Sequence, residues 1–246
     1  MAVRWKVTIA YKGSHFLGWQ RLPKGRTVQQ EIEQLLKKIH REQVLITGSG
    51  RTDRGVSAES QVFHFDSFLR IPKEQWLKIF RMMLPSDIYV KEVEEVDPTF
   101  HARRNVTKKR YNYYIECGEY NVLESDYVYQ LNRSVDLERM REAAKLFVGT
   151  KDFTAFNSTP LDIIENQVRT LREITITRQG SKVVLSFLGK GFLRHMVRMI
   201  VAVILDVGLG RMEISDIEAM FEQNDKEACK FKANAEGLRL MEVFYD

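Results

Sequence analysis

A short glycine-rich segment holds the residues best suited to chemistry. The segment from Gly48 to Val56 reads GSGRTDRGV, so that Asp53 lies between Arg51 and Arg54. Glycines give the backbone conformations closed to other residues and let a ligand approach it closely. Because nearby cations favour the charged form of a carboxyl group, we expect Asp53 to stay ionised. The pattern predicts a catalytic loop, and the alternative is a surface turn with an incidental ion pair.

A second candidate site is a basic segment followed by tyrosines. It places five cations within eight positions, directly ahead of three rings: Arg103, Arg104, Lys108, Lys109, Arg110, Tyr111, Tyr113 and Tyr114. Cations neutralise phosphates and aromatic rings stack on unpaired bases, so this composition suits a nucleic-acid surface. The alternative is a solvated strand edge, whose charges discourage pairing with another sheet.

An apolar segment, residues 192–207, predicts a buried helix that contains an arginine. Arg194 and Arg198 lie four residues apart, on a helix face shared with Gly191, His195 and Ala202. Arginine is almost never fully buried unless it is paired. Arg198 therefore needs a carboxylate partner or a polar cavity, or else its guanidinium reaches solvent. For His195 a packing or hydrogen-bonding role is expected, and His64 is expected to be structural.

The composition is that of a globular protein with a modest positive charge. The chain has 246 residues, of which 44% are hydrophobic and 29% charged, and its net charge is +5. This length permits one large domain or two smaller ones. The charge favours a polyanionic partner.

Export, membrane insertion and metal binding are not expected. The first residues enter an alternating strand pattern at once, without the apolar core of a signal peptide. The longest apolar run, residues 199–205, is far shorter than the roughly 20 residues that span a bilayer. Cys117 and Cys229 lie far apart and form no C-x-x-C pair, so neither a disulfide framework nor a zinc site is indicated. A reducing cytoplasm fits these features.

Hydrophobic periodicity predicts two α+β halves, each an antiparallel sheet with helices on one face. In the first half we expect strands at 3–11, 44–47, 60–65 and 88–93, with helices at 27–40 and 72–84. In the second half we expect strands at 110–116, twice within 174–187 and at 238–245, with helices at 136–148, 192–207 and 215–223. We place the boundary between 104 and 105, giving lobes of residues 1–104 and 105–246.

Seven segments together resemble the tRNA pseudouridine synthase A family. They occur in the order typical of the family and span nearly the whole chain: Tyr11-Lys12-Gly13 through Phe16-Leu17-Gly18-Trp19-Gln20, Gly50-Arg51-Thr52-Asp53 with Gly55-Val56 and Ala58, Phe100-His101-Ala102-Arg103, Arg110-Tyr111-Asn112-Tyr113, residues 149–156 (GTKDFTAF), residues 192–198 (FLRHMVR), and Ala235-Glu236-Gly237-Leu238 leading into Val243-Phe244-Tyr245.

The resemblance implies a fold, an activity and a partner. The fold would be two ferredoxin-like α+β lobes with a basic active-site cleft between them. The activity would be isomerisation of uridine to pseudouridine in the anticodon stem-loop, at tRNA positions 38, 39 and 40. The family acts as a homodimer that binds tRNA across both subunits. The reaction needs no cofactor, because composition does not change.

The resemblance also implies residue roles. Asp53 matches the catalytic aspartate, Tyr111 the tyrosine that stacks on the target uracil, and Arg198 the arginine that pairs with the aspartate. Arg51 would help to extrude or replace the flipped base. The phosphate contacts would be Arg103, Arg104, Lys108, Lys109 and Arg110.

The sequence leaves open the modified tRNA positions, the chemical route and an alternative function. Arg54 and Ser57 stand where bacterial members of the family have Ala and His, so the modified tRNA positions are not decided. A carboxylate could attack C1′, attack C6, or remove the C2′ proton, and the resemblance favours this last, glycal, route. A non-catalytic tRNA-binding or chaperone protein is the alternative function. An aspartyl hydrolase is disfavoured, because Asp53 has no acidic neighbour within three positions and its arginines would repel a metal ion.

Overall fold

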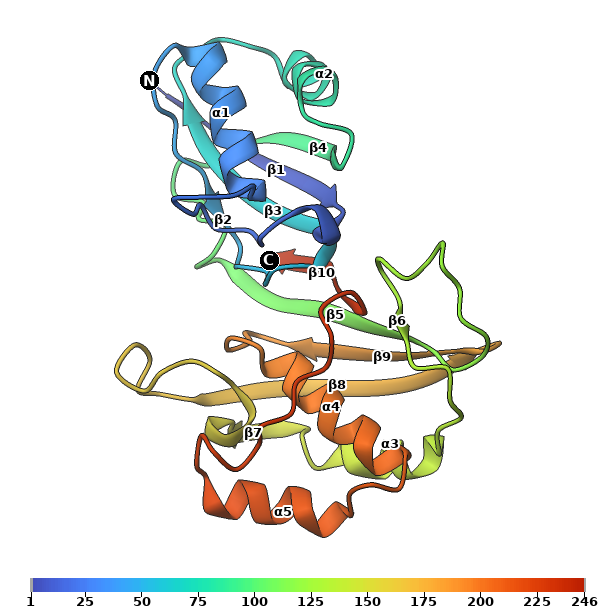
Figure 1. The fold of residues 1–246 in the computed structure, drawn as a ribbon. Helices are drawn as coiled ribbons and strands as arrows, with labels where there is room; N and C mark the ends of the chain where they lie inside the picture. Colours follow the sequence, from blue (N-terminus) through green and yellow to red (C-terminus); the bar gives the residue numbers. More distant parts are fainter. Residues whose placement is uncertain (1, 246) are drawn as a thin grey trace. The chain divides into compact units, whose positions relative to one another are not determined.

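The computed structural model describes residues 2–245 and has an α+β fold (Figure 1). Contacts divide the chain into two compact units. The first extends to Thr107 and includes the segment from Arg239 onward, and the second runs from Lys108 to Leu238. Most strand pairs are antiparallel, and five α-helices lie within the described residues. The α+β class predicted from the sequence is confirmed.

The sheet of the first unit has β1 (Val3–Tyr11) between β3 (Ser57–Ser67) and β4 (Ile88–Val96). Both neighbours are antiparallel to β1, and Val7 pairs with Phe63 on one side and Val93 on the other. The last strand, β10 (Leu238–Tyr245), runs parallel to the start of β3, where Arg239 pairs with Ser57 and Leu240 with Ala58. This pairing groups the segment from Arg239 with the first unit, whereas the sequence prediction had placed it in the second lobe.

Two helices of the first unit follow the apolar pattern of the sequence. Helix α1 (Val28–His40) is capped by the Thr27 hydroxyl, which accepts a hydrogen bond from Gln30 N at 3.4 Å. Helix α2 (Lys73–Met83) begins after Pro72 and buries Trp76 and Phe80. The Trp76 ring packs edge-on against Phe65 of β3, with ring centroids 5.3 Å apart. These aromatic contacts form the core between helix and sheet.

The strand predicted at 44–47 is mostly wrong. Only β2 (Thr47–Gly48) is a strand, and it pairs with His64 and Phe63 of β3. Upstream of it, the Ile46 N–H donates to the Glu33 carboxylate of α1 at 3.1 Å. This backbone group is therefore satisfied by a helix side chain instead of a neighbouring strand.

The sheet of the second unit has the order β5, β9, β8, β7, all antiparallel. The strands are β5 (Val106–Glu116), β7 (Gly149–Asp152), β8 (Val168–Gln179) and β9 (Lys182–Gly189). A two-residue strand, β6 (Tyr129–Gln130), runs parallel to the end of β5. In this register Tyr111 of β5 lies opposite Phe187 of β9.

Three helices belong to the second unit: α3 (Leu137–Lys145), α4 (Met196–Gly208) and α5 (Ile214–Gln223). Helix α4 begins later than predicted, because His195 has a left-handed φ of 61°. Arg194 and His195 therefore precede the helix, and the predicted shared face of these residues with Arg198 is wrong. Within residues 2–245, none of the helices combines the length and apolar character that a membrane crossing demands.

Candidate active site

Asp53 lies in the loop between β2 and β3, which we call the Asp53 loop (residues 49–56). Its side chain is half-buried, whereas Arg51 and Arg54 on either side are exposed. The Val56 N–H donates to the Asp53 carbonyl at 3.1 Å, which closes a turn around the aspartate. The loop thus carries one half-buried carboxylate between two exposed arginines.

Residues that follow β1 hold the Asp53 loop from one side. The Trp19 N–H donates to the Thr52 carbonyl at 3.1 Å, and the Tyr11 and Thr52 hydroxyls are 2.8 Å apart. The Gly13 N–H donates to Ser57 Oγ at 2.9 Å. Burial raises the pKa of Tyr11 to about 12, so its hydroxyl keeps its proton at physiological pH. Three backbone or hydroxyl contacts therefore fix the residues next to Asp53.

Two glycines make this close approach possible. A Cβ on Gly13 would lie 2.2 Å from the Val56 carbonyl carbon, which is far inside contact distance. Gly18 has a φ of +104°, and a Cβ there would lie 2.8 Å from the Thr52 carbonyl oxygen. Sequence reasoning gave Gly13 and Gly18 no role beyond membership of a motif. The sequence did contain a signal for close backbone packing, since both glycines follow shortly after the strand that ends at Tyr11.

A fully buried glutamine holds the start of the Asp53 loop. Gln61 of β3 accepts a hydrogen bond from Ser49 Oγ at 2.6 Å and donates to the Gly50 carbonyl at 3.2 Å. The Ser49 N–H donates to the Val62 carbonyl at 2.7 Å. Sequence reasoning did not single out Gln61. Its signal was an amide side chain inside the strand expected at 60–65, because a buried amide needs internal hydrogen-bond partners.

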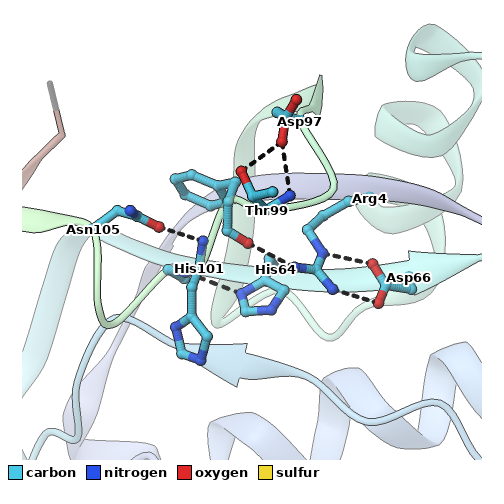
Figure 2. Close-up of polar contacts among 9 residues, drawn as sticks. Arg4, His64, Asp66, Asp97, Thr99, His101 and Asn105 are labelled. Atoms are coloured by element: carbon cyan, nitrogen blue, oxygen red, sulfur yellow. Dashed lines mark hydrogen bonds and ion pairs between the residues drawn. The ribbon is translucent and has the colours of Figure 1, made fainter.

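A second ordered loop carries Arg103 and Arg104, and we call it the His101 loop (residues 97–105; Figure 2). His64 Nδ1 of β3 accepts a hydrogen bond from the Ala102 N–H at 3.1 Å. His101 Nδ1 accepts from the backbone N–H groups of Arg103 and Arg104 at 3.2 and 3.3 Å. Both imidazoles thus act as acceptors that shape the loop, which agrees with the structural role expected for His64.

An ion pair lies beside these histidines. Arg4 of β1 binds both carboxylate oxygens of Asp66 at 2.7 Å and also donates to the Phe100 carbonyl at 2.8 Å (Figure 2). This contact lowers the pKa of Asp66. Burial, followed by the charges of Arg4 and His101, lowers the pKa of His64 to about 4. His64 is therefore neutral at physiological pH and can accept the Ala102 hydrogen bond.

In the second unit, Tyr111 is buried on β5. Its ring packs edge-on against Phe192, with centroids 5.0 Å apart and an interplanar angle of 78°. Side chains alternate between the two faces of a strand, so Lys109 shares the face of Tyr111 while Lys108 and Arg110 lie on the opposite face. Lys109 is buried and the other two are half-buried. The predicted phosphate contacts of this strand do not share one face.

Arg198 lies in the first turn of α4 and is half-buried. Its Nε donates to the Ala233 carbonyl at 2.8 Å, and its own carbonyl accepts from the Ala233 N–H at 3.0 Å. The following residues are held by β5, because Tyr113 Oη donates to the Asn234 carbonyl at 2.9 Å. His195 Nδ1 lies 3.0 Å from Ser158 Oγ, in a hydrogen bond of the kind expected from the sequence.

The structure therefore distributes the predicted residues over two units. Asp53, Arg51 and Arg103 belong to the first, and Arg51 and Arg103 line one surface hollow there. Tyr111 and Arg198 belong to the second. Among residues 2–245, no three His, Cys, Asp or Glu side chains are grouped so that they could hold a metal ion.

Known proteins resemble this chain over its full length. The model of a family described as "tRNA pseudouridine synthase" matches residues 7–104 and 143–246. A tRNA pseudouridine synthase A of Geobacillus sp. is 41% identical over 100% of both chains. Proteins of the same name from Exiguobacterium sp. and Staphylococcus aureus (strain MSSA476) are 40% and 43% identical, covering 99% and 98% of this chain and 98% and 90% of theirs. These matches confirm the resemblance drawn from the seven motifs. The chain belongs to the tRNA pseudouridine synthase family, a family of isomerases.

Proposed function

We propose that this protein converts uridine to pseudouridine in the anticodon stem-loop of tRNA, at positions 38, 39 and 40, with Asp53 as the catalytic carboxylate. The observation that carries the proposal is the geometry of the Asp53 loop. Bonds from Tyr11, Gly13, Trp19 and Gln61 hold the residues around Asp53, while its side chain stays half-buried between exposed arginines. A carboxylate held in this way is preorganised for reaction.

The reaction breaks the N1–C1′ bond, turns the uracil and forms a C5–C1′ bond, without a net change of composition. In the glycal route, Asp53 removes the C2′ proton as the N1–C1′ bond breaks. It returns that proton to C2′ when C5 attacks C1′, and the C5 proton is then lost while N1 becomes protonated. This proton balance needs no cofactor, and the one residue required to move protons at the sugar is Asp53.

The target uracil must first leave the stack of the stem-loop, because its reacting atoms cannot be reached there. We assign Tyr111 to stack on the extruded ring, which is worth about 1–3 kcal/mol per base. Arg198 would pair with Asp53 and aim it through a charge-assisted hydrogen bond. Arg51 would handle the flipped base. Arg103, Lys108, Lys109 and Arg110 are the proposed phosphate contacts.

The finer architecture is part of the same proposal. The two units would be ferredoxin-like lobes on either side of a basic active-site cleft, and two copies of the chain would bind tRNA as a homodimer. Support comes from the seven motifs and from the separation of Asp53 and the Tyr111–Arg198 pair into different units.

The test maps pseudouridine at nucleotide resolution in tRNA incubated with the wild type, Asp53→Asn and Asp53→Ala. Both variants should abolish pseudouridine formation and keep tRNA affinity within about a few-fold, because the carboxylate acts in the transition state and not in binding. Asp162→Asn is the matched control, since Asp162 is exposed in the second unit. Appreciable turnover by either Asp53 variant would contradict the assignment of Asp53 as the catalytic carboxylate. A wild type that binds tRNA without modifying it would favour the non-catalytic alternative.

A further inference from the structure

A hollow of about 390 Å³ lies beside the Asp53 loop, entirely within the first unit. Its lining includes Trp19, Arg21, Gln29, Gly48, Arg51 and Arg103. A volume of this size falls within the roughly 300–1,000 Å³ typical of small-ligand sites. The hollow is therefore large enough for one small polar ligand and too small for a folded partner.

The charge of the hollow is positive. Arg21, Arg51 and Arg103 come from three separate segments, and all three are exposed. None of the described residues that line the hollow is acidic. Guanidinium groups bind phosphate oxygens through paired hydrogen bonds, so three of them around one hollow favour a phosphate-bearing ligand.

A buried carboxylate holds one wall of the hollow in place. Glu33 of α1 is only 3% exposed, and its Oε2 pairs with Arg21 Nη1 at 3.0 Å. Its Oε1 accepts hydrogen bonds from Gln29 Nε2 at 3.0 Å and from the Ile46 N–H at 3.1 Å. Glu33 thus holds Gln29 through a hydrogen bond and Arg21 through an ion pair. Most surface arginines have no buried carboxylate partner, whereas Arg21 has one in Glu33.

Gly48 and the buried Trp19 form one wall of the hollow. A Cβ on Gly48 would lie 2.6 Å from the Trp19 indole ring, so only glycine lets the ring lie against this strand. Arg103 reaches the rim from the His101 loop, whose backbone is held by the two imidazoles. Cationic walls beside amide and hydroxyl side chains suit the phosphate and ribose of a nucleotide, which are the groups that most protein contacts to nucleic acids reach.

We propose that this hollow binds one nucleotide of the RNA strand next to the uridine that reacts, with Arg21 and Arg103 on its phosphate and Gln29 on its ribose or base edge. The proposal rests on the proposed function, because it takes the substrate to be RNA. The role of the hollow is to anchor the strand while the uridine is extruded.

The test compares tRNA binding by Arg21→Gln, Arg21→Lys and Arg70→Gln, all in the Asp53→Asn background so that turnover does not enter. Arg70 is the matched control, since it is exposed and lies beyond the opposite end of β3 from Asp53. Affinities are measured over a series of salt concentrations. Arg21→Gln should weaken binding about tenfold and lower the slope of log K against log salt by about 1, as expected for one lost phosphate contact.

Arg21→Lys keeps the positive charge but loses the paired hydrogen bonds of the guanidinium. It should therefore keep the salt slope of the parent and bind tRNA more tightly than Arg21→Gln. Arg70→Gln should change affinity less than about twofold, in the range of a charge remote from the RNA. Arg21→Gln behaving like Arg70→Gln in both affinity and slope would overturn the proposal.

The two proposals fail separately. Turnover by Asp53→Ala together with weak binding by Arg21→Gln would end the catalytic assignment and leave the hollow as proposed. Loss of turnover by Asp53→Ala with normal binding by Arg21→Gln would support the catalytic assignment and overturn the proposal for the hollow. A wild type that does not bind tRNA would overturn both. Thermal unfolding of Arg21→Gln and Arg21→Lys checks that both variants fold.

Discussion

The residues assigned to the reaction are held in different ways in the two units. Asp53 sits on a loop, and its position depends on contacts from β1, η1 (Gly13–His15) and β3. Tyr111 and Arg198 sit on a strand and a helix, whose hydrogen-bonded frames set their directions. The loop residue thus relies on packing between distant segments, whereas the other two rely on regular secondary structure.

This difference predicts which substitutions should disturb the positions of the assigned residues. Loops carry much of the chemistry of proteins because they are placed by a rigid scaffold. A loop without regular hydrogen bonds keeps its geometry only while each holding contact remains. We therefore expect the Asp53 loop to be sensitive to changes several residues away, and the Tyr111 strand to respond mainly to changes at Tyr111 itself.

The largest effect is expected from Gly13→Ala. Its new Cβ would lie 2.2 Å from the Val56 backbone, so the chain at the end of the Asp53 loop must move. A displacement of about 1 Å at a catalytic group can reduce the rate about 100-fold. We expect a loss of that order in kcat for pseudouridine formation, with a smaller change in tRNA affinity.

Gly191→Ala in the second unit is the matched control. A Cβ on Gly191 meets no atom within 4 Å, although the residue immediately precedes Phe192, which packs on Tyr111. Its kcat should remain close to that of the wild type. Equal losses in Gly13→Ala and Gly191→Ala would remove the contrast between the loop and the strand.

A moderate effect is expected from Tyr111→Ala. Loss of a stacking ring costs about 1–3 kcal/mol, which is roughly a 5- to 150-fold reduction in kcat/KM. Tyr111→Phe keeps the ring and its contact with Phe192, so it should retain more activity than Tyr111→Ala. Steady-state kinetics on the two variants provide the measurement. Equal loss in both would show that the hydroxyl, and not the ring, is essential.

The smallest effect concerns the His101 loop and pH. The unfolded chain takes up a proton at His64 near pH 6.5, whereas burial lowers the pKa in the folded chain to about 4. Between these values the unfolded state binds more protons, so the free energy of unfolding falls as the pH falls. His64→Gln keeps an acceptor for the Ala102 N–H without titrating, and it should flatten this dependence.

Denaturant unfolding at a series of pH values measures this slope. Tyr111→Phe serves as the comparison from the second unit, because it should keep the slope of the wild type. An unchanged slope between pH 6.5 and 4 in His64→Gln would contradict the role given to His64 in the His101 loop.

Much of the secondary structure could be predicted because its signals are local. The helices expected at 27–40 and 72–84 are α1 and α2, and the strand expected at 3–11 is β1. The misses have tertiary causes. The segment before β2 is not a strand because Glu33 binds its backbone at Ile46, and α4 starts late because His195 takes a left-handed conformation. Neither cause is visible in a hydrophobic pattern.

The sequence by itself determined the α+β class, most element positions and, through seven motifs in order, the family. Residue types and spacing singled out Asp53, the tyrosine cluster that includes Tyr111, and Arg198, and the resemblance to the family then assigned roles to these three residues. Tertiary structure alone decided that β10 pairs with β3 of the first unit, and that Glu33 and Gln61 hold the walls around the Asp53 loop. The physical reason is that these features depend on hydrogen bonds and close contacts between residues distant in the chain, which local propensity does not encode.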